Sequence, residues 1–152
     1  MATKMTEYEK QLLAQAKKLK KFGGVFAGAD IKNPSTEFLN KAVHIDPFVI
    51  RFVANQSYDL RLRAVRQNGL SLEYVNGATE EIELAAVKQN GMAIKFIRNP
   101  SREVQMAAVK QNLNAYKLIA RPHKDVTLFY FEYCKTVHYG PGQGLAGGKT
   151  AR

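Results

Sequence analysis

The sequence is poor in the residues that disulfide frameworks, cysteine-bound metals and membrane spans require. Cys134 is the single cysteine in 152 residues, which excludes an intrachain disulfide and a cysteine-based metal cluster. No run of about 18 apolar residues and no signal-peptide pattern occurs, so the sequence predicts no membrane span. These absences favour a reducing, cytoplasm-like compartment.

Residue groupings typical of catalytic sites are also missing. His44, His123 and His138 fall in unlike segments without metal-ligand spacing, and no Ser-His-Asp, Cys-His or paired-carboxylate arrangement stands out. The segment GQGLAGGKT (142–150) resembles a Walker A loop, but it has one residue too many between its glycines and too few residues after it for a helix. We therefore predict no enzymatic activity, no metal and no cofactor.

Positive charge is in excess. Lysine and arginine number 23 against 13 acidic residues, which gives a net charge of +10. Such a field favours polyanionic partners such as nucleic acid, acidic protein surfaces or anionic membranes. The Lys-rich segment KKLKKF (17–22) could contact an anionic membrane, but its apolar side is better explained as part of a capping helix.

A repeat organises most of the chain. AAVKQN occurs at 85–90 and again at 107–112, RAVRQN at 63–68 is a near copy, and successive Ala-Val pairs are 22 residues apart. This period divides the chain into four units: 37–58, 59–80, 81–102 and 103–124. We expect each unit to open with an α-helix of about ten residues, capped by Ser or Thr. The helix should end at Asn68-Gly69, Asn90-Gly91 or Asn112-Leu113, because Asn and Gly tolerate the left-handed conformation, or at Asp46-Pro47 in the first unit. A shorter apolar helix should follow it.

The pattern predicts an all-α fold, a short right-handed α-solenoid of four two-helix repeats. We expect one domain over 1–139, with an N-terminal capping helix at 6–22, the repeats at 37–124 and an aromatic cap at 125–139. A helix is favoured for the cap, and a strand is the alternative. The Gly-rich residues 140–152 are predicted to be a flexible tail. In the third unit, the side chains expected to face inward are those of Ile82, Leu84, Ala86 and Val87.

Two stretches carry a family resemblance, DLRLRAVRQNGLSLEYV (59–75) and NPSREVQMAAVKQNLNAYKLIA (99–120). They resemble variant leucine-rich repeats, which pair an α-helix with a 3₁₀-like helix, and a family of AVKQNG-type repeats of unknown function from bacterial and phage-encoded proteins. The resemblance implies the fold and says almost nothing about activity. Some variant leucine-rich repeat proteins hold a cysteine-bound iron–sulfur cluster, which a chain with one cysteine does not match.

Two columns of equivalent residues are candidate binding sites. The residue after each Ala-Val pair forms the basic column, namely His44, Arg66, Lys88 and Lys110. A second column contains Arg51, Glu73, Lys95 and Lys117 and is interrupted by the glutamate. These cations could bind nucleic acid or an acidic protein, or form a solvated stripe near helix C-termini.

Two further columns are better explained by structure. The invariant glutamines, Gln67, Gln89 and Gln111, are expected to hydrogen-bond between repeats rather than to recognise bases. The aromatic residues Phe52, Tyr74 and Phe96 are expected in the core.

We conclude that the chain is a non-enzymatic repeat protein that binds another macromolecule. A protein partner is favoured. The resemblance to phage-encoded repeats implies an accessory phage protein that acts on a host or virion component, in the host cytoplasm or the virion. Sequence-independent nucleic-acid binding is the alternative, and no oligomeric state follows from the sequence.

Overall fold

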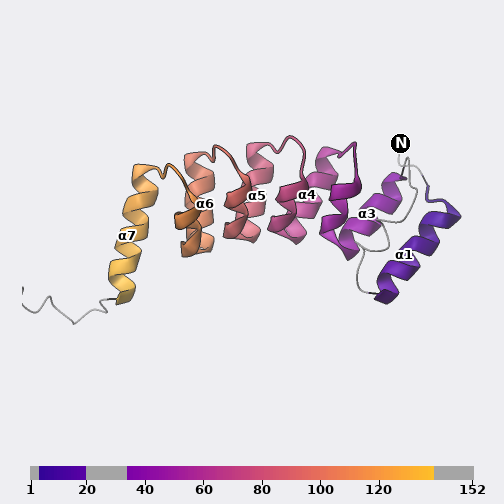
Figure 1. Ribbon diagram of the computed structural model, residues 1–152, viewed down its shortest axis with the longest axis horizontal. Coiled ribbons are helices and arrows are strands. Elements are labelled where there is room, and N and C mark those ends of the chain that lie inside the picture. The colour runs from indigo at the N-terminus through magenta and orange to yellow at the C-terminus, as the bar shows by residue number, and fades with distance from the viewer. Residues whose placement is uncertain (1–3, 20–33, 139–152) are drawn as a thin grey trace, which may run out of the picture.

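The computed structural model describes residues 4–19 and 34–138, and every regular element in these ranges is helical (Figure 1). The α-helices are α1 (Glu7–Leu19), α3 (Thr36–Ile45), α4 (Tyr58–Gln67), α5 (Glu80–Gln89), α6 (Arg102–Gln111) and α7 (Lys124–His138). Four 3₁₀ helices alternate with them, namely η1 (Pro47–Phe52), η2 (Gly69–Tyr74), η3 (Gly91–Phe96) and η4 (Leu113–Leu118). Successive α-helices from α3 to α7 pack side by side, and the η helices pack on each other in a second row. The predicted helical repeat fold is confirmed.

Hydroxyl side chains begin the α-helices, as the sequence indicates. Ser35, Ser57 and Ser101 accept hydrogen bonds from the backbone N–H three residues later. Thr79 occupies the same position before α5 but makes no such bond. Three of the four repeat helices therefore have the cap that satisfies a free amide of the first turn.

The asparagines that end the α-helices correct our expectation of a left-handed conformation. Asn68, Asn90 and Asn112 have φ values of −145°, −150° and −150°, which is extended backbone. Each side chain accepts a hydrogen bond of 3.0 Å from the N–H two residues later, at the start of the η helix. Asp46 does the same for Phe48 at 2.9 Å. One residue thus ends the α-helix and caps the 3₁₀ helix, which requires extended rather than left-handed backbone.

Gly69 and Gly91 are needed for close packing between units, not for an unusual φ. A Cβ atom at Gly69 would collide with the carbonyl oxygen of Ala86, and one at Gly91 with that of Ala108. The helices η2 and η3 therefore start against the backbone of the next α-helix. Leu113 occupies the equivalent position in the last unit, where the chain continues into α7 instead of another repeat helix.

The Ala-Val pairs form the central seam of the core. All eight residues are fully buried, namely Ala42, Val43, Ala64, Val65, Ala86, Val87, Ala108 and Val109. The small alanine allows neighbouring helices to approach closely, and the valine fills the space between them. Leu84, expected to face inward, is only half-buried and also borders the outer surface.

The N-terminal helix α1 packs on α3 through Leu12, Leu13 and Ala16, which are buried. The sequence predicts this helix over 6–22, and the structure describes it over Glu7–Leu19. The side chains of Leu19 and Phe22 lie outside what is described. The predicted tail at 140–152 also lies outside the described residues.

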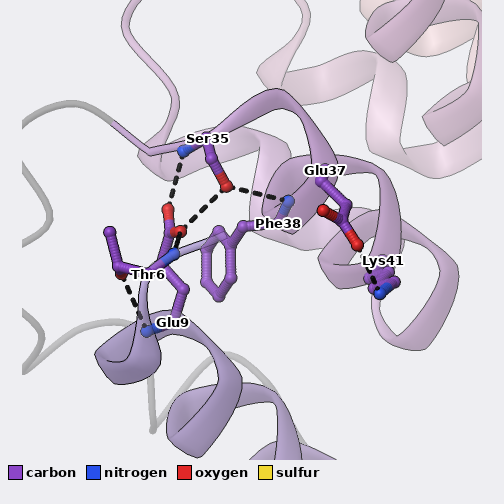
Figure 2. A network of polar contacts seen from close by, with 6 residues as sticks. All are labelled: Thr6, Glu9, Ser35, Glu37, Phe38 and Lys41. Carbon is purple, nitrogen blue, oxygen red and sulfur yellow. Dashed lines mark hydrogen bonds and ion pairs between the residues drawn. The ribbon is translucent and has the colours of Figure 1, made fainter. Parts of the chain in front are cut away.

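A buried polar network fixes α1 to the first repeat (Figure 2). The predicted capping box is present, since Thr6 N donates to Glu9 Oε2 at 2.8 Å and Glu9 N donates to Thr6 Oγ1 at 3.2 Å. The Glu9 carboxylate also accepts from Ser35 N at 2.6 Å and Ser35 Oγ at 2.8 Å. Burial alone would raise the pKa of Glu9, but the hydrogen bonds from Ser35 and Thr6 outweigh it and lower that pKa.

The helix α7 covers the other end only in part. It is a helix, not a strand, and Val126 is fully buried, but Leu128, Phe131 and Tyr133 are 62%, 53% and 44% exposed. The ring of Tyr130 stacks on Tyr116 of η4 with centroids 4.1 Å apart. The C-terminal cap therefore attaches through contacts that include this stacked pair and Val126, and it leaves several large apolar side chains at the surface.

Candidate binding surface

The basic column lies at the C-terminal turns of the repeat α-helices, and all four side chains are exposed: His44, Arg66, Lys88 and Lys110. Acidic residues lie at the opposite ends of the same helices, with Glu81 and Glu103 in the first turns of α5 and α6. A ten-residue helix is about 15 Å long. The row of α-helices therefore has a basic edge at the helix C-termini and an acidic edge at the N-termini, about 15 Å apart.

The invariant glutamines hold these helix ends in register. Gln89 accepts from Gly69 N at 2.6 Å and donates to Gln67 O at 3.2 Å, while Gln111 accepts from Gly91 N at 2.6 Å. The expected inter-repeat hydrogen bonds are thus present, and they set the spacing of the basic column.

The first junction varies this pattern. Gln67 Nε2 donates to His44 O at 3.0 Å, as Gln89 does to the carbonyl oxygen of Gln67. Pro47 stands at the position of the glycines and has no N–H to donate to the Gln67 side chain. The Gln67 side chain therefore bridges the first and second units through His44, by its carbonyl oxygen and, at 3.4 Å, its ring Nδ1.

A groove of about 690 Å³ lies on the outer surface of α5 and α6, and we call it the α5–α6 groove. It is lined by Leu84, Lys88, Arg102, Glu103, Met106, Ala107, Lys110 and Gln111. Its centre is apolar, whereas Lys88 and Lys110 lie at one end and Arg102 and Glu103 at the other. Of the seven predicted binding residues, the groove brings together these two lysines.

The partners of the charged side chains differ between the two ends of the groove. Arg102 forms an ion pair with Asp125 of α7. Lys110 lies 5.7 Å from the centre of the Phe129 ring, a cation–π distance. Within residues 4–19 and 34–138, neither Lys88 nor Lys110 has an acidic partner at ion-pair distance. The positive charge at the α-helix C-termini is therefore not neutralised by the described part of the chain.

The second column lies on the η row, away from the groove. Arg51, Glu73, Lys95 and Lys117 are all exposed. Arg51 and Lys95 lie over the rings of Phe52 and Phe96 at 4.5 and 4.6 Å. The seven predicted binding residues thus divide between two rows of helices and do not form one surface.

The aromatic column on the η helices corrects another expectation. Phe52 is 36% exposed, and Tyr74 and Phe96 are half-buried rather than in the core. The aromatic rings cover the edge of the core, and two of them lie beneath neighbouring cations. The fully inward positions of the η helices belong instead to Val49, Ile50, Ala93, Ile94 and Ala115.

Two buried or half-buried glutamines with structural roles were not predicted from the sequence. Gln105 is 7% exposed and bridges two loops, donating to Pro100 O at 3.0 Å and accepting from His123 N at 2.8 Å. Gln56 accepts from Asn76 N at 2.8 Å in a comparable bridge. Both side chains join a loop of one unit to the loop of the next, which no local sequence pattern indicates.

Arg61, Glu83 and Gln105 form one column at the 22-residue period. Arg61 donates to two carbonyl oxygens of the loop after η2, and Gln105 donates to that of Arg121. Burial raises the pKa of Glu83, and the nearby Glu80 raises it further. Arg61 and Gln105 thus bind loop carbonyl groups, whereas Glu83 places an acid at the equivalent position of the third unit. These contacts with the loops are seen only in the tertiary structure.

The described residues hold no group of three or more His, Cys, Asp or Glu side chains placed to bind a metal ion. His44 and His123 lie on different elements, and the side chain of His138 is not described. Within the same ranges, no helix has the length and apolar character needed to cross a membrane.

One family model matches the chain. It is described as a domain of unknown function (DUF4116), and it matches residues 57–100. The matched segment contains α4, η2, α5 and η3, which are two consecutive repeat units. Neither a curated protein nor a solved structure matches the chain.

Proposed function

We propose that the protein is a non-enzymatic binding module whose α-helix row docks on another protein. The observation that carries this proposal is the α5–α6 groove, where an apolar centre lies beside two lysines without acidic partners in the described residues. Interfaces of this kind combine a desolvated apolar centre with a charged rim. The resemblance to AVKQNG-type repeats supports the further proposal of a phage accessory protein that acts in the host cytoplasm or virion.

Sequence-independent nucleic-acid binding is the second candidate, because the repeat places one exposed basic side chain at each α-helix C-terminus. Phosphate contacts of this type give an affinity that falls steeply with salt. The triple variant Arg66/Lys88/Lys110→Glu should lower both the affinity and the salt slope if the basic column binds a phosphate backbone. No binding of RNA or DNA at ~50 mM salt would eliminate this candidate.

Cross-linking tests the leading proposal. A photoreactive residue at position 103, an exposed position at one end of the groove, should cross-link the otherwise unchanged chain to one dominant protein in a nuclease-treated host extract. Lys88→Glu/Lys110→Glu should abolish that product, whereas Lys95→Glu/Lys117→Glu, with the same change in charge on the η row, should retain it. A product that survives both double variants, or a product that requires nucleic acid, would contradict the proposal.

A further inference from the structure

The α5–α6 groove is hollow because Ala107 of the fourth unit stands where the first two units have a long cation. The column that faces the outer surface contains Lys41, Arg63, Ala85 and Ala107. Lys41 and Arg63 are exposed, whereas Ala85 and Ala107 are half-buried. Ala107 lines the groove between α5 and α6, whereas Ala85, its equivalent on α5, does not. The alanine at position 107 therefore leaves this surface uncovered where the first two units have a long cation.

Apolar side chains form the floor that this change uncovers. Leu84 and Met106 are equivalent residues of the two units, and both are half-buried beside Ala107. The volume of about 690 Å³ is within the range of sites that hold a ligand or several side chains of a partner. The floor therefore offers an apolar contact that a solvated charged stripe does not need.

We propose, on the basis of the function proposed above, that the α5–α6 groove binds a short acidic amphipathic segment of a partner protein. Apolar side chains of the segment pack on Leu84, Met106 and Ala107, and its carboxylates pair with Lys88 and Lys110. A segment of about ten residues in a helix matches the ~15 Å length of α6.

The charges give the segment a direction. Lys88 and Lys110 lie at the C-terminal ends of α5 and α6, so the acidic residues of the segment lie at that end. Glu103 lines the opposite end, and the charge of Arg102 is paired with Asp125. An acidic side chain is thus favoured at one end of the groove and disfavoured at the other.

The same charges disfavour a nucleic acid as the occupant. A phosphate backbone laid along the groove would meet Glu103 as well as the lysines. The apolar floor offers no donor to phosphate, because it consists of leucine, methionine and alanine side chains. A protein segment can place acidic side chains at the lysine end of the groove, none at the Glu103 end, and apolar side chains on the floor. Protein is therefore the class of partner that fits the groove.

The variant Ala107→Arg separates the two classes of partner. It copies Arg63 of the second unit into the fourth, so it fills the groove with a side chain that the fold already accepts. It also adds positive charge. Binding of an acidic segment should weaken about tenfold or more, because the apolar floor is covered, whereas phosphate-backbone binding should be unchanged or stronger.

The experiment is a selection of random peptides of about 12 residues, ~18 Å as a helix, on the full chain, followed by affinity measurements on the variants. We expect enriched peptides to combine large apolar residues with Asp or Glu and to lose about tenfold or more in affinity for Ala107→Arg and for Lys88→Glu/Lys110→Glu. The control Lys95→Glu/Lys117→Glu should bind as the wild type does. Thermal melting of each variant verifies that it is folded.

Other outcomes would overturn the inference. Enrichment of no peptide, of peptides without acidic residues, or of peptides that bind Ala107→Arg at full affinity would each do so. If the peptide selection fails but a host protein still cross-links in a way that depends on Lys88 and Lys110, only the inference about the acidic segment is refuted. The proposed function then stands. If labelled oligouridylate binds and Ala107→Arg binds it equally well, nucleic acid replaces protein as the partner.

Discussion

The buried carboxylate of Glu9 should account for a measurable share of the stability of the N-terminal end. Glu9 is 3% exposed and accepts hydrogen bonds from Ser35 N, Ser35 Oγ and Thr6 N. The same Ser35 hydroxyl accepts from Phe38 N at 3.2 Å, so the carboxylate also orients the cap of α3 (Figure 2). Replacing Glu9 by alanine removes the acceptor from two buried donors of Ser35.

The magnitude follows from these contacts. A buried donor left without a partner costs about 1–3 kcal/mol, so the loss of the acceptor for two donors in Glu9→Ala should lower the free energy of unfolding by about 2–6 kcal/mol. Urea unfolding followed by circular dichroism measures this change, and hydrogen exchange should show faster exchange of the Phe38 amide. The matched control is Glu37→Gln, since Glu37 pairs with Lys41 at the surface and should leave the midpoint close to that of the wild type.

The pH dependence gives an independent check of the Glu9 prediction. The pKa of Glu9 is lower in the folded chain than its ordinary value, so its contribution is complete above the ordinary pKa and is lost as the pH falls through the folded pKa. The difference between wild type and Glu9→Gln should therefore shrink in that acidic range. A Glu9→Ala variant with the wild-type midpoint at pH 7 would refute the reasoning.

Two further predictions concern the repeats. Gly91→Ala should lower the free energy of unfolding by about 1–3 kcal/mol, because its methyl group meets the carbonyl oxygen of Ala108, and an unchanged urea midpoint would contradict this packing. Glu83→Gln should raise the melting temperature at pH 7, because burial and Glu80 raise the pKa of Glu83 and make its charge unfavourable. The gain should disappear as the pH falls through that raised pKa, and a gain that persists at low pH would indicate another cause.

The period of 22 made the fold predictable, because one unit repeats a helix cap, a packing pair and a helix end in the same order. The conformation of Asn90 was not predictable from the residue type, since asparagine suits both a left-handed helix end and an extended cap. Asp46 before Pro47 contained the missing signal, because aspartate followed by proline is a typical helix start. The sequence pattern therefore located the junction but assigned it the wrong conformation.

The candidate site was predictable only in part. Lys88 and Lys110 are visible as a column in the sequence, but the groove beside them depends on the surface that Ala107 leaves uncovered. The bond from Ser35 to Glu9 joins residues 26 positions apart, which no local pattern indicates. Sequence periodicity therefore predicts the glutamine bonds that recur between units, but not contacts that occur once, such as the groove and the Glu9 network.

The most direct test of the account is the methyl NMR signal of Met106. The chain has four methionines, so selective ¹³C-methyl labelling gives few signals, and Met92 on η3 is an internal control. Titration with a selected acidic peptide should shift the Met106 signal and leave the Met92 signal in place, and Ala107→Arg should suppress the shift. Binding of the peptide with no change at Met106 would contradict docking in the α5–α6 groove.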